Sequence, residues 1–243
     1  DGSIQSGSAE AGNVPVQVGY DAFVKSGRQK NAKGEITWKV GVDLRSQDIS
    51  HVRVCDLLVY GDTLDGSKIT GLPDGIAYQD LTAQYHQKYE ENSFQNDFGG
   101  SLTVHPILQD GVRVADLLEV TGITNTKPAS FTFDTQLLDP DIYAGNKTIS
   151  VPNTAVLFQG NTRLNSATAF VPYQSSMLAK EMLKRGTDPV SGVNSGRTQN
   201  ANEGFDYQDK SVVFRFSVNA DSMDVTNMKR ADGAALGKAL LSD

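Results

Sequence analysis

Histidine and acidic side chains are the usual metal ligands and proton carriers, and this chain of 243 residues has three histidines. No spacing among His51, His86 and His105 resembles a metal site. Four acids near glycine-containing turns match no complete calcium loop and suit ordinary turns: Asp62, Asp65, Asp139 and Asp141. We also find no nucleophile elbow, phosphate-binding loop or dinucleotide fingerprint. The sequence therefore predicts no metal and no cofactor.

Composition and charge exclude further classes. Hydrophobic residues make up 38% and charged residues 21% of the chain, which indicates a globular protein. No apolar run is long enough to cross a bilayer, so we expect no membrane insertion. The formal net charge is −7 and the basic residues are scattered, which argues against nucleic acid as a partner. Cys55 is the only cysteine, so no intrachain disulfide is possible.

Short runs of alternating apolar and polar residues, separated by glycine-containing turns, follow residues 1–17, which we interpret as a flexible lead-in. In the clearest run, 34–43, Ile36, Trp38 and Val40 share one face. Further strands are expected at 51–59, 101–108, 129–134, 147–159 and 167–171. Residues 78–96 suit a short helix or an ordered loop, and 177–185 a helix or a strand. The pattern predicts an all-β, immunoglobulin-like β-sandwich.

The chain also contains an internal repeat. Residues 36–43 align with 212–219, and the same ungapped register pairs Asp56 with Asp232. Upstream, allowing one gap, 23–27 aligns with 182–186. We therefore expect one domain over 18–173 and, over 174–243, the start of a second, similar domain that is incomplete.

The first domain resembles a known family. The segments KSG at 25–27, EITWKVGVD at 35–43 and DISHVRVCD at 48–56 resemble the opening half of collagen-binding-type adhesin domains of Gram-positive bacteria. Antigen I/II C-terminal domains and major pilins are similar. FTFDT at 131–135, VPNTAVL at 151–157 and NSATAFVP at 165–172 match the closing half in style.

This resemblance implies an extracellular, cell-surface adhesin, pilin or stalk module, attached to the cell wall through regions outside this chain. Its partners would be a host protein or glycan, or neighbouring pilus or adhesin subunits. It would not be an enzyme acting on an external substrate.

In such domains a lysine of the first strand and an asparagine of a late strand condense into an intramolecular isopeptide bond, assisted by a buried acid. Carried over, the resemblance implies a Lys25–Asn153 bond assisted by Asp56. Burial keeps a lysine amine neutral and nucleophilic, and keeps a carboxyl protonated so that it can polarise the amide carbonyl. In the second copy the counterparts are Lys184 and Asp232, with Lys180 as an alternative lysine; no asparagine partner is identifiable there.

Strand parity agrees with this assignment, because each proposed reactant shares a face with apolar residues of its own strand. The pairs are Phe23 with Lys25, Val54 with Asp56, and Val151 with Asn153. Lys39 alternates with Trp38 and Val40 and should face outward. The simpler alternative is a solvated Lys25, with Asp56 and Asn153 as ordinary turn residues.

Two other functions stay open. A ligand-binding module would use loops at the end of the sandwich, where a polar and aromatic stretch holds Tyr78, Gln84, Tyr85, Gln87 and Tyr89. A polysaccharide-cleaving domain would need paired carboxylates in a cleft, and the sequence shows no such pair.

Overall fold

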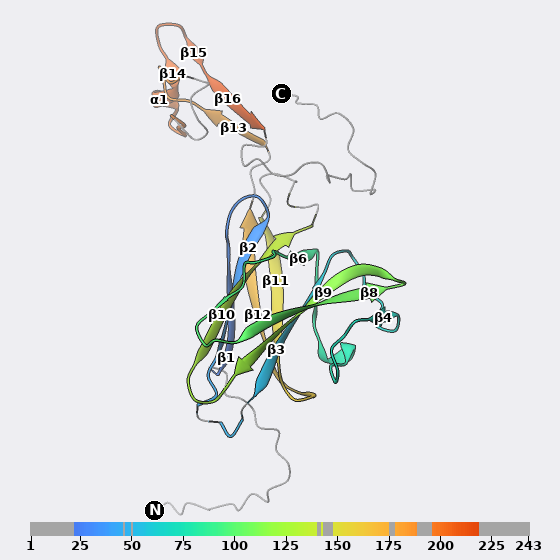
Figure 1. Ribbon diagram of the computed structural model, residues 1–243. Helices are drawn as coiled ribbons and strands as arrows, with labels where there is room; N and C mark the ends of the chain where they lie inside the picture. The colour runs from blue at the N-terminus through green and yellow to red at the C-terminus, as the bar shows by residue number, and fades with distance from the viewer. Residues whose placement is uncertain are drawn as a thin grey trace, which may run out of the picture.

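The computed structural model describes residues 22–45, 47–49, 51–139, 142, 148–174, 178–188 and 196–218. The lead-in at 1–17 and Asp232 lie outside these residues. Strands dominate the described chain (Figure 1), which confirms the predicted all-β class. Within this part of the chain, no helix is long and apolar enough to cross a membrane.

The first sheet of the sandwich, sheet A, has the strand order β1-β2-β10-β6, and β7 also pairs with β10. Its strands are β1 (Phe23–Gln29), β2 (Glu35–Val42), β6 (Gln87–Tyr89), β7 (Gln95–Asn96) and β10 (Ala129–Leu137). Burial alternates strictly along β2 and β10, as expected for strands with one face in a core. Ile36, Trp38 and Val40 are fully buried, as their shared face predicted.

The second sheet, sheet B, has the order β12-β11-β3-β9-β8-β4, with β5 parallel to β3. Its strands are β3 (Val52–Val59), β4 (Ile69–Thr70), β5 (Ala83–Tyr85), β8 (Ser101–Gln109), β9 (Val112–Ile123), β11 (Thr148–Gln159) and β12 (Thr162–Gln174). All its other pairings are antiparallel. The main core lies between the two sheets, which gives an immunoglobulin-like sandwich.

Sheet B also carries a second, smaller core on its other face. There Cys55, Leu57 and Val59 of β3 pack with residues of the connection that contains β4 and the short 3₁₀ helix Tyr78–Asp80. Because both faces of β3 are covered, its sequence is almost continuously apolar.

A separate strand pair, β13 (Leu178–Met182) with β16 (Phe214–Val218), lies beyond the sandwich domain in sequence (Figure 1). A short helix, α1 (Ala201–Gly204), and the pair β14 (Phe205–Asp206) with β15 (Ser211–Val212) accompany it. Within the segment 177–185, residues 178–182 thus form a strand and Leu183 an isolated bridge, and the helical alternative was wrong. Backbone pairing with β16 decides this choice.

Candidate functional site

A lysine and an aspartate form a contact inside the main core. Lys25 of β1 reaches from sheet A to Asp56 of β3 in sheet B, with Nζ 2.6 Å from Oδ2. The side chains are 0% and 4% exposed, so water does not screen the pair. The Lys25 ammonium also lies 5.0 Å from the ring centroid of Phe133 and 5.7 Å from that of Trp38.

Asn153 of β11 belongs to the same cluster. It is fully buried, and strand β11 is the neighbour of β3 within sheet B. Cys55 pairs with Val156, so the register sets Asn153 diagonally across from Asp56 on the inner face. The structure therefore brings together all three residues proposed for the first domain, whereas Lys39 is exposed on the outer face of β2.

Burial moves both charged groups toward their neutral forms. It lowers the pKa of Lys25, and the nearby Asp56 charge and hydrogen bond only oppose that shift. Burial likewise raises the pKa of Asp56, against the attraction and hydrogen bond of Lys25 and a weaker polar contact from Asn153. Such a pair favours a free amine beside a protonated acid. Among the described side chains, two buried oxygens have no hydrogen-bond partner: Asp56 Oδ1 and Asn153 Oδ1.

Gln87, which the sequence suggests only for a ligand groove, is buried and also contacts the site. Gln87, 1% exposed, accepts a 3.2 Å hydrogen bond from Asn153 Nδ2 through Oε1. Its Nε2 donates to the backbone oxygen of Pro152 at 2.7 Å. No local motif marks Gln87. The one available signal was a polar residue inside a short alternating run, since β6 buries Gln87 and Tyr89 while Lys88 faces out.

In the segment that the sequence aligns with the first domain, the strand register gives a different lysine the equivalent position. In the first domain Lys25 pairs with Val40, and the ungapped repeat equates Val40 with Phe216. Phe216 pairs with Lys180, not with Lys184. Lys180 Nζ lies 4.9 Å from the Phe216 ring centroid, much as Lys25 lies beside aromatic rings.

Lys184, in contrast, follows the end of β13. Its side chain is 54% exposed and its Nζ lies 3.2 Å from a Glu203 carboxylate oxygen. The gapped alignment that selected Lys184 therefore differs from the strand register by four residues. Its other proposed counterpart, Asp232, lies outside the described residues.

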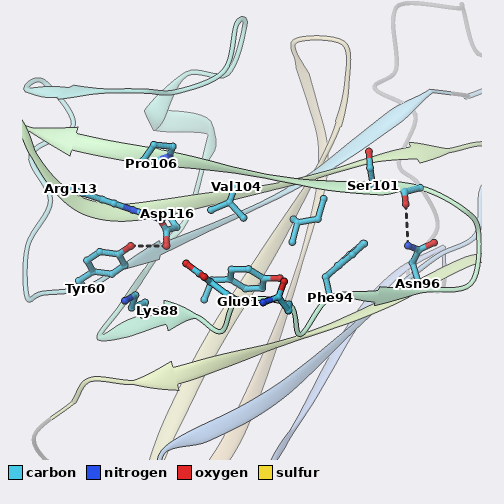
Figure 2. A pocket seen from close by; sticks show the side chains of 14 residues that line it. Tyr60, Lys88, Glu91, Phe94, Asn96, Ser101, Val104, Pro106, Arg113 and Asp116 are labelled. Carbon is cyan, nitrogen blue, oxygen red and sulfur yellow. Dashed lines mark hydrogen bonds and ion pairs between the residues drawn. The ribbon is translucent and has the colours of Figure 1, made fainter.

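A groove of about 710 Å³ opens where sheet A ends at β6 and β7 and sheet B continues into β8. Figure 2 shows Tyr60, Arg113 and Asp116 at one end of it and Asn96 with Ser101 at the other. Tyr60 Oη donates to Asp116 Oδ2 at 2.6 Å, and Arg113 Nε donates to Asp116 Oδ1 at 2.8 Å, so this end is held in place.

Of the five residues that the sequence suggested for a ligand groove, Tyr89 lines this one. Gln84 and Gln87 are buried, whereas Tyr85 is exposed on β5 and Tyr78 packs against the second core. These four do not line the groove.

No protein-family model matches the sequence, and no curated protein matches it. Similar solved structures include the collagen-binding subdomain of the Enterococcus faecalis surface protein ACE, with 13% identity over 63% of this chain and 97% of that one, at a TM-score of 0.33. The collagen-binding domain of a Staphylococcus aureus adhesin has 12% identity over 62% and 97%, at 0.34. That of the Erysipelothrix rhusiopathiae surface protein RspB has 13% over 63% and 49%, at 0.32.

These likenesses concern the fold alone.

Proposed function

We propose that this chain is a structural module of a cell-surface adhesin or pilus, cross-linked internally by a Lys25–Asn153 isopeptide bond. The observation that carries the proposal is the buried Lys25–Asp56 contact with Asn153 beside it. A buried ion pair seldom stabilises a fold more than apolar residues would, so its presence in this core calls for another role. A module of this kind acts outside the cell, where a cross-linked sandwich resists load and unfolding.

The chemistry needs no cofactor. The neutral Lys25 amine attacks the Asn153 side-chain carbonyl carbon and forms a new C–N bond. Protonated Asp56 donates to the carbonyl oxygen, which would give a partner to each of the two unpartnered oxygens. Asp56 then relays one amine proton to the departing nitrogen, the old C–N bond breaks, and one ammonia leaves. Asp56 ends as it began, and the reaction happens once per molecule.

Residues 174–243 begin a second domain of the same type in this proposal. The β13–β16 pair repeats the register of β1–β2, with Lys180 at the Lys25 position. Phe214 and Phe216 correspond to the buried Trp38 and Val40, yet are 48% and 36% exposed. Among the described residues no sheet packs on this face. If the boundary is right, residues 18–173 alone will keep the melting temperature of the sandwich and its cross-link.

The intact mass of the purified chain tests the cross-link. We expect a deficit of one ammonia relative to the sequence, which disappears in Lys25→Met. Lys39→Met is the matched control, since Lys39 is a strand lysine on the outer face and should leave the deficit intact. Full mass in the parent chain would remove the three residues as reactants.

We propose ligand binding in the groove as a second function that can coexist with the first. Lys88 and Glu91 line it with side chains of opposite charge, and neither forms an ion pair within the described chain. The Lys88 ammonium lies 5.9 Å from the ring centroid of Tyr60, and charged side chains of both signs on a preformed concave surface suit a polar host protein or glycan. Binding of the chain to immobilised matrix proteins and to a glycan array should be lost in Lys88→Glu and kept in Lys39→Glu. Equal binding by both variants would exclude the groove.

A further inference from the structure

The orientation of the Asn153 side-chain amide follows from its partner Gln87, whose own orientation is set by a group that can only accept, the Pro152 carbonyl. The indole N–H of Trp38 can only donate, and it donates to Thr135 Oγ1 at 2.9 Å. The Thr135 hydroxyl accepts that bond and keeps its own hydrogen, which it can donate to Gln87 Oε1, 3.4 Å away. At the other end, the Pro152 carbonyl can only accept, so it requires the Gln87 amino group.

The Pro152 carbonyl thus gives Gln87 an orientation with Oε1 facing Asn153, and the hydrogen bond from Thr135 agrees with it. Asn153 must then present its Nδ2 to Gln87, and its Oδ1 points away from Gln87. The reversed amide would set two acceptor oxygens against each other in a buried site, which is costly. The hydrogen-bond partners therefore identify which atom of the Asn153 amide is the oxygen and which is the nitrogen. The shape of the amide does not, because its two ends look alike.

We propose that Gln87 orients the reacting amide for cross-linking, an inference that rests on the proposed isopeptide reaction. Gln87 holds the nitrogen that leaves as ammonia, so the carbonyl oxygen stays without a hydrogen-bond partner and can accept the Asp56 proton during the reaction. Its position on β6 makes this possible. The chain passes from β5, paired in sheet B, to β6, paired in sheet A, through His86 in a left-handed backbone conformation (φ 56°). This switch between sheets brings Gln87 into the core beside β11.

The test compares the rate of ammonia loss in three variants made by cell-free synthesis and sampled by intact mass. Gln87→Met keeps the length of the side chain but removes the acceptor that holds the Asn153 amide, which can then rotate. We expect the rate of ammonia loss to fall on the order of tenfold to a hundredfold. Gln87→Glu keeps an acceptor toward Asn153 and should react faster than Gln87→Met. Gln84→Met is the matched control, because Gln84 is 2% exposed and donates to the Thr82 carbonyl without touching the site.

Melting temperatures of the same samples separate orientation from general damage. Slow reaction in Gln87→Met, with Gln84→Met reacting at the parent rate despite a similar loss of melting temperature, supports the orienting role. A parent rate in Gln87→Met, or equal slowing in both methionine variants, overturns it while leaving the cross-link itself established. Full mass in the parent overturns the cross-link and the role of Gln87 together. If Gln87→Met does not fold, Gln87→Glu decides: ammonia loss in folded protein, at the parent rate or below it, supports the acceptor role, and no reaction in folded protein overturns it.

Discussion

Removal of the cross-link should lower the stability of the sandwich by an amount that the loop length predicts. Lys25 and Asn153 would close a loop of roughly 130 residues, and the chain-entropy relation assigns about 5 kcal/mol to such a closure. For a domain of this size, each kcal/mol moves the melting temperature by about 2–4 °C. The cross-link should therefore be worth about 10–20 °C.

A single substitution would mix this effect with the cost of an orphaned buried charge. The better perturbation is the double variant Lys25→Met/Asp56→Leu, because replacing both partners of a buried pair with apolar residues is often neutral. The single tryptophan, Trp38, is 0% exposed in the core and gives a fluorescence signal for unfolding of the sandwich. Thermal unfolding of parent and double variant at neutral pH then gives the difference.

The entropic reasoning fails if the parent has lost one ammonia and yet melts within a few degrees of the double variant. The control is the double variant Lys25→Met/Lys39→Met. Because Lys39 lies on the outer face, its replacement should add nothing to the change in melting temperature caused by Lys25→Met alone.

Two other predictions follow from the same core. A Cβ at Gly27 would lie 2.4 Å from the Trp38 ring and 2.7 Å from Val171, so Gly27→Ala should cost about 1–3 kcal/mol in urea unfolding. Gly61→Ala, with no atom within 4 Å, should cost far less, and equal losses would contradict the packing argument. In Lys25→Met, Asp56 stays buried and its folded pKa is raised above the ordinary value of 3.8. The protonated form therefore contributes stability below pH 3.8, and this contribution is lost as the pH rises through the folded pKa. The melting temperature of Lys25→Met should thus fall relative to that of the double variant as the pH rises above the ordinary carboxyl pKa, and parallel pH profiles would contradict the raised pKa.

Alternating and apolar runs predicted six of the twelve strands of the sandwich: β2, β3, β8, β10, β11 and part of β12. They missed β9, whose apolar run contains Asp116 and Glu119. Both acids are buried. Asp116 pairs with its near neighbour Arg113 and with the distant Tyr60, and Glu119 pairs with the distant Arg53 and His105. Pairing between distant side chains, which no local pattern contains, makes these acids tolerable in a core strand.

The site divides in the same way. Lys25, Asp56 and Asn153 could be proposed because strand parity and family resemblance are each visible in the sequence of a single strand. Gln87 could not, since its role depends on the chain changing sheets at His86. The choice between Lys180 and Lys184 depends on the pairing register of β13 with β16, which a gapped alignment does not fix.

The position of β11 beside the last strand of the sandwich has a consequence for a chain pulled from both ends. β11 pairs only with β12 and, at its far end, with β3. With Lys25 joined to Asn153, the pulled path enters at β1, crosses the bond into β11 and leaves through β12. The residues between 25 and 153 lie outside that path and would carry no load. Only the β11–β12 hairpin could unfold under the load, which would release about 70 Å of extended chain, compared with about 500 Å for the whole domain without the bond. Such a module would act as a tether of nearly fixed length.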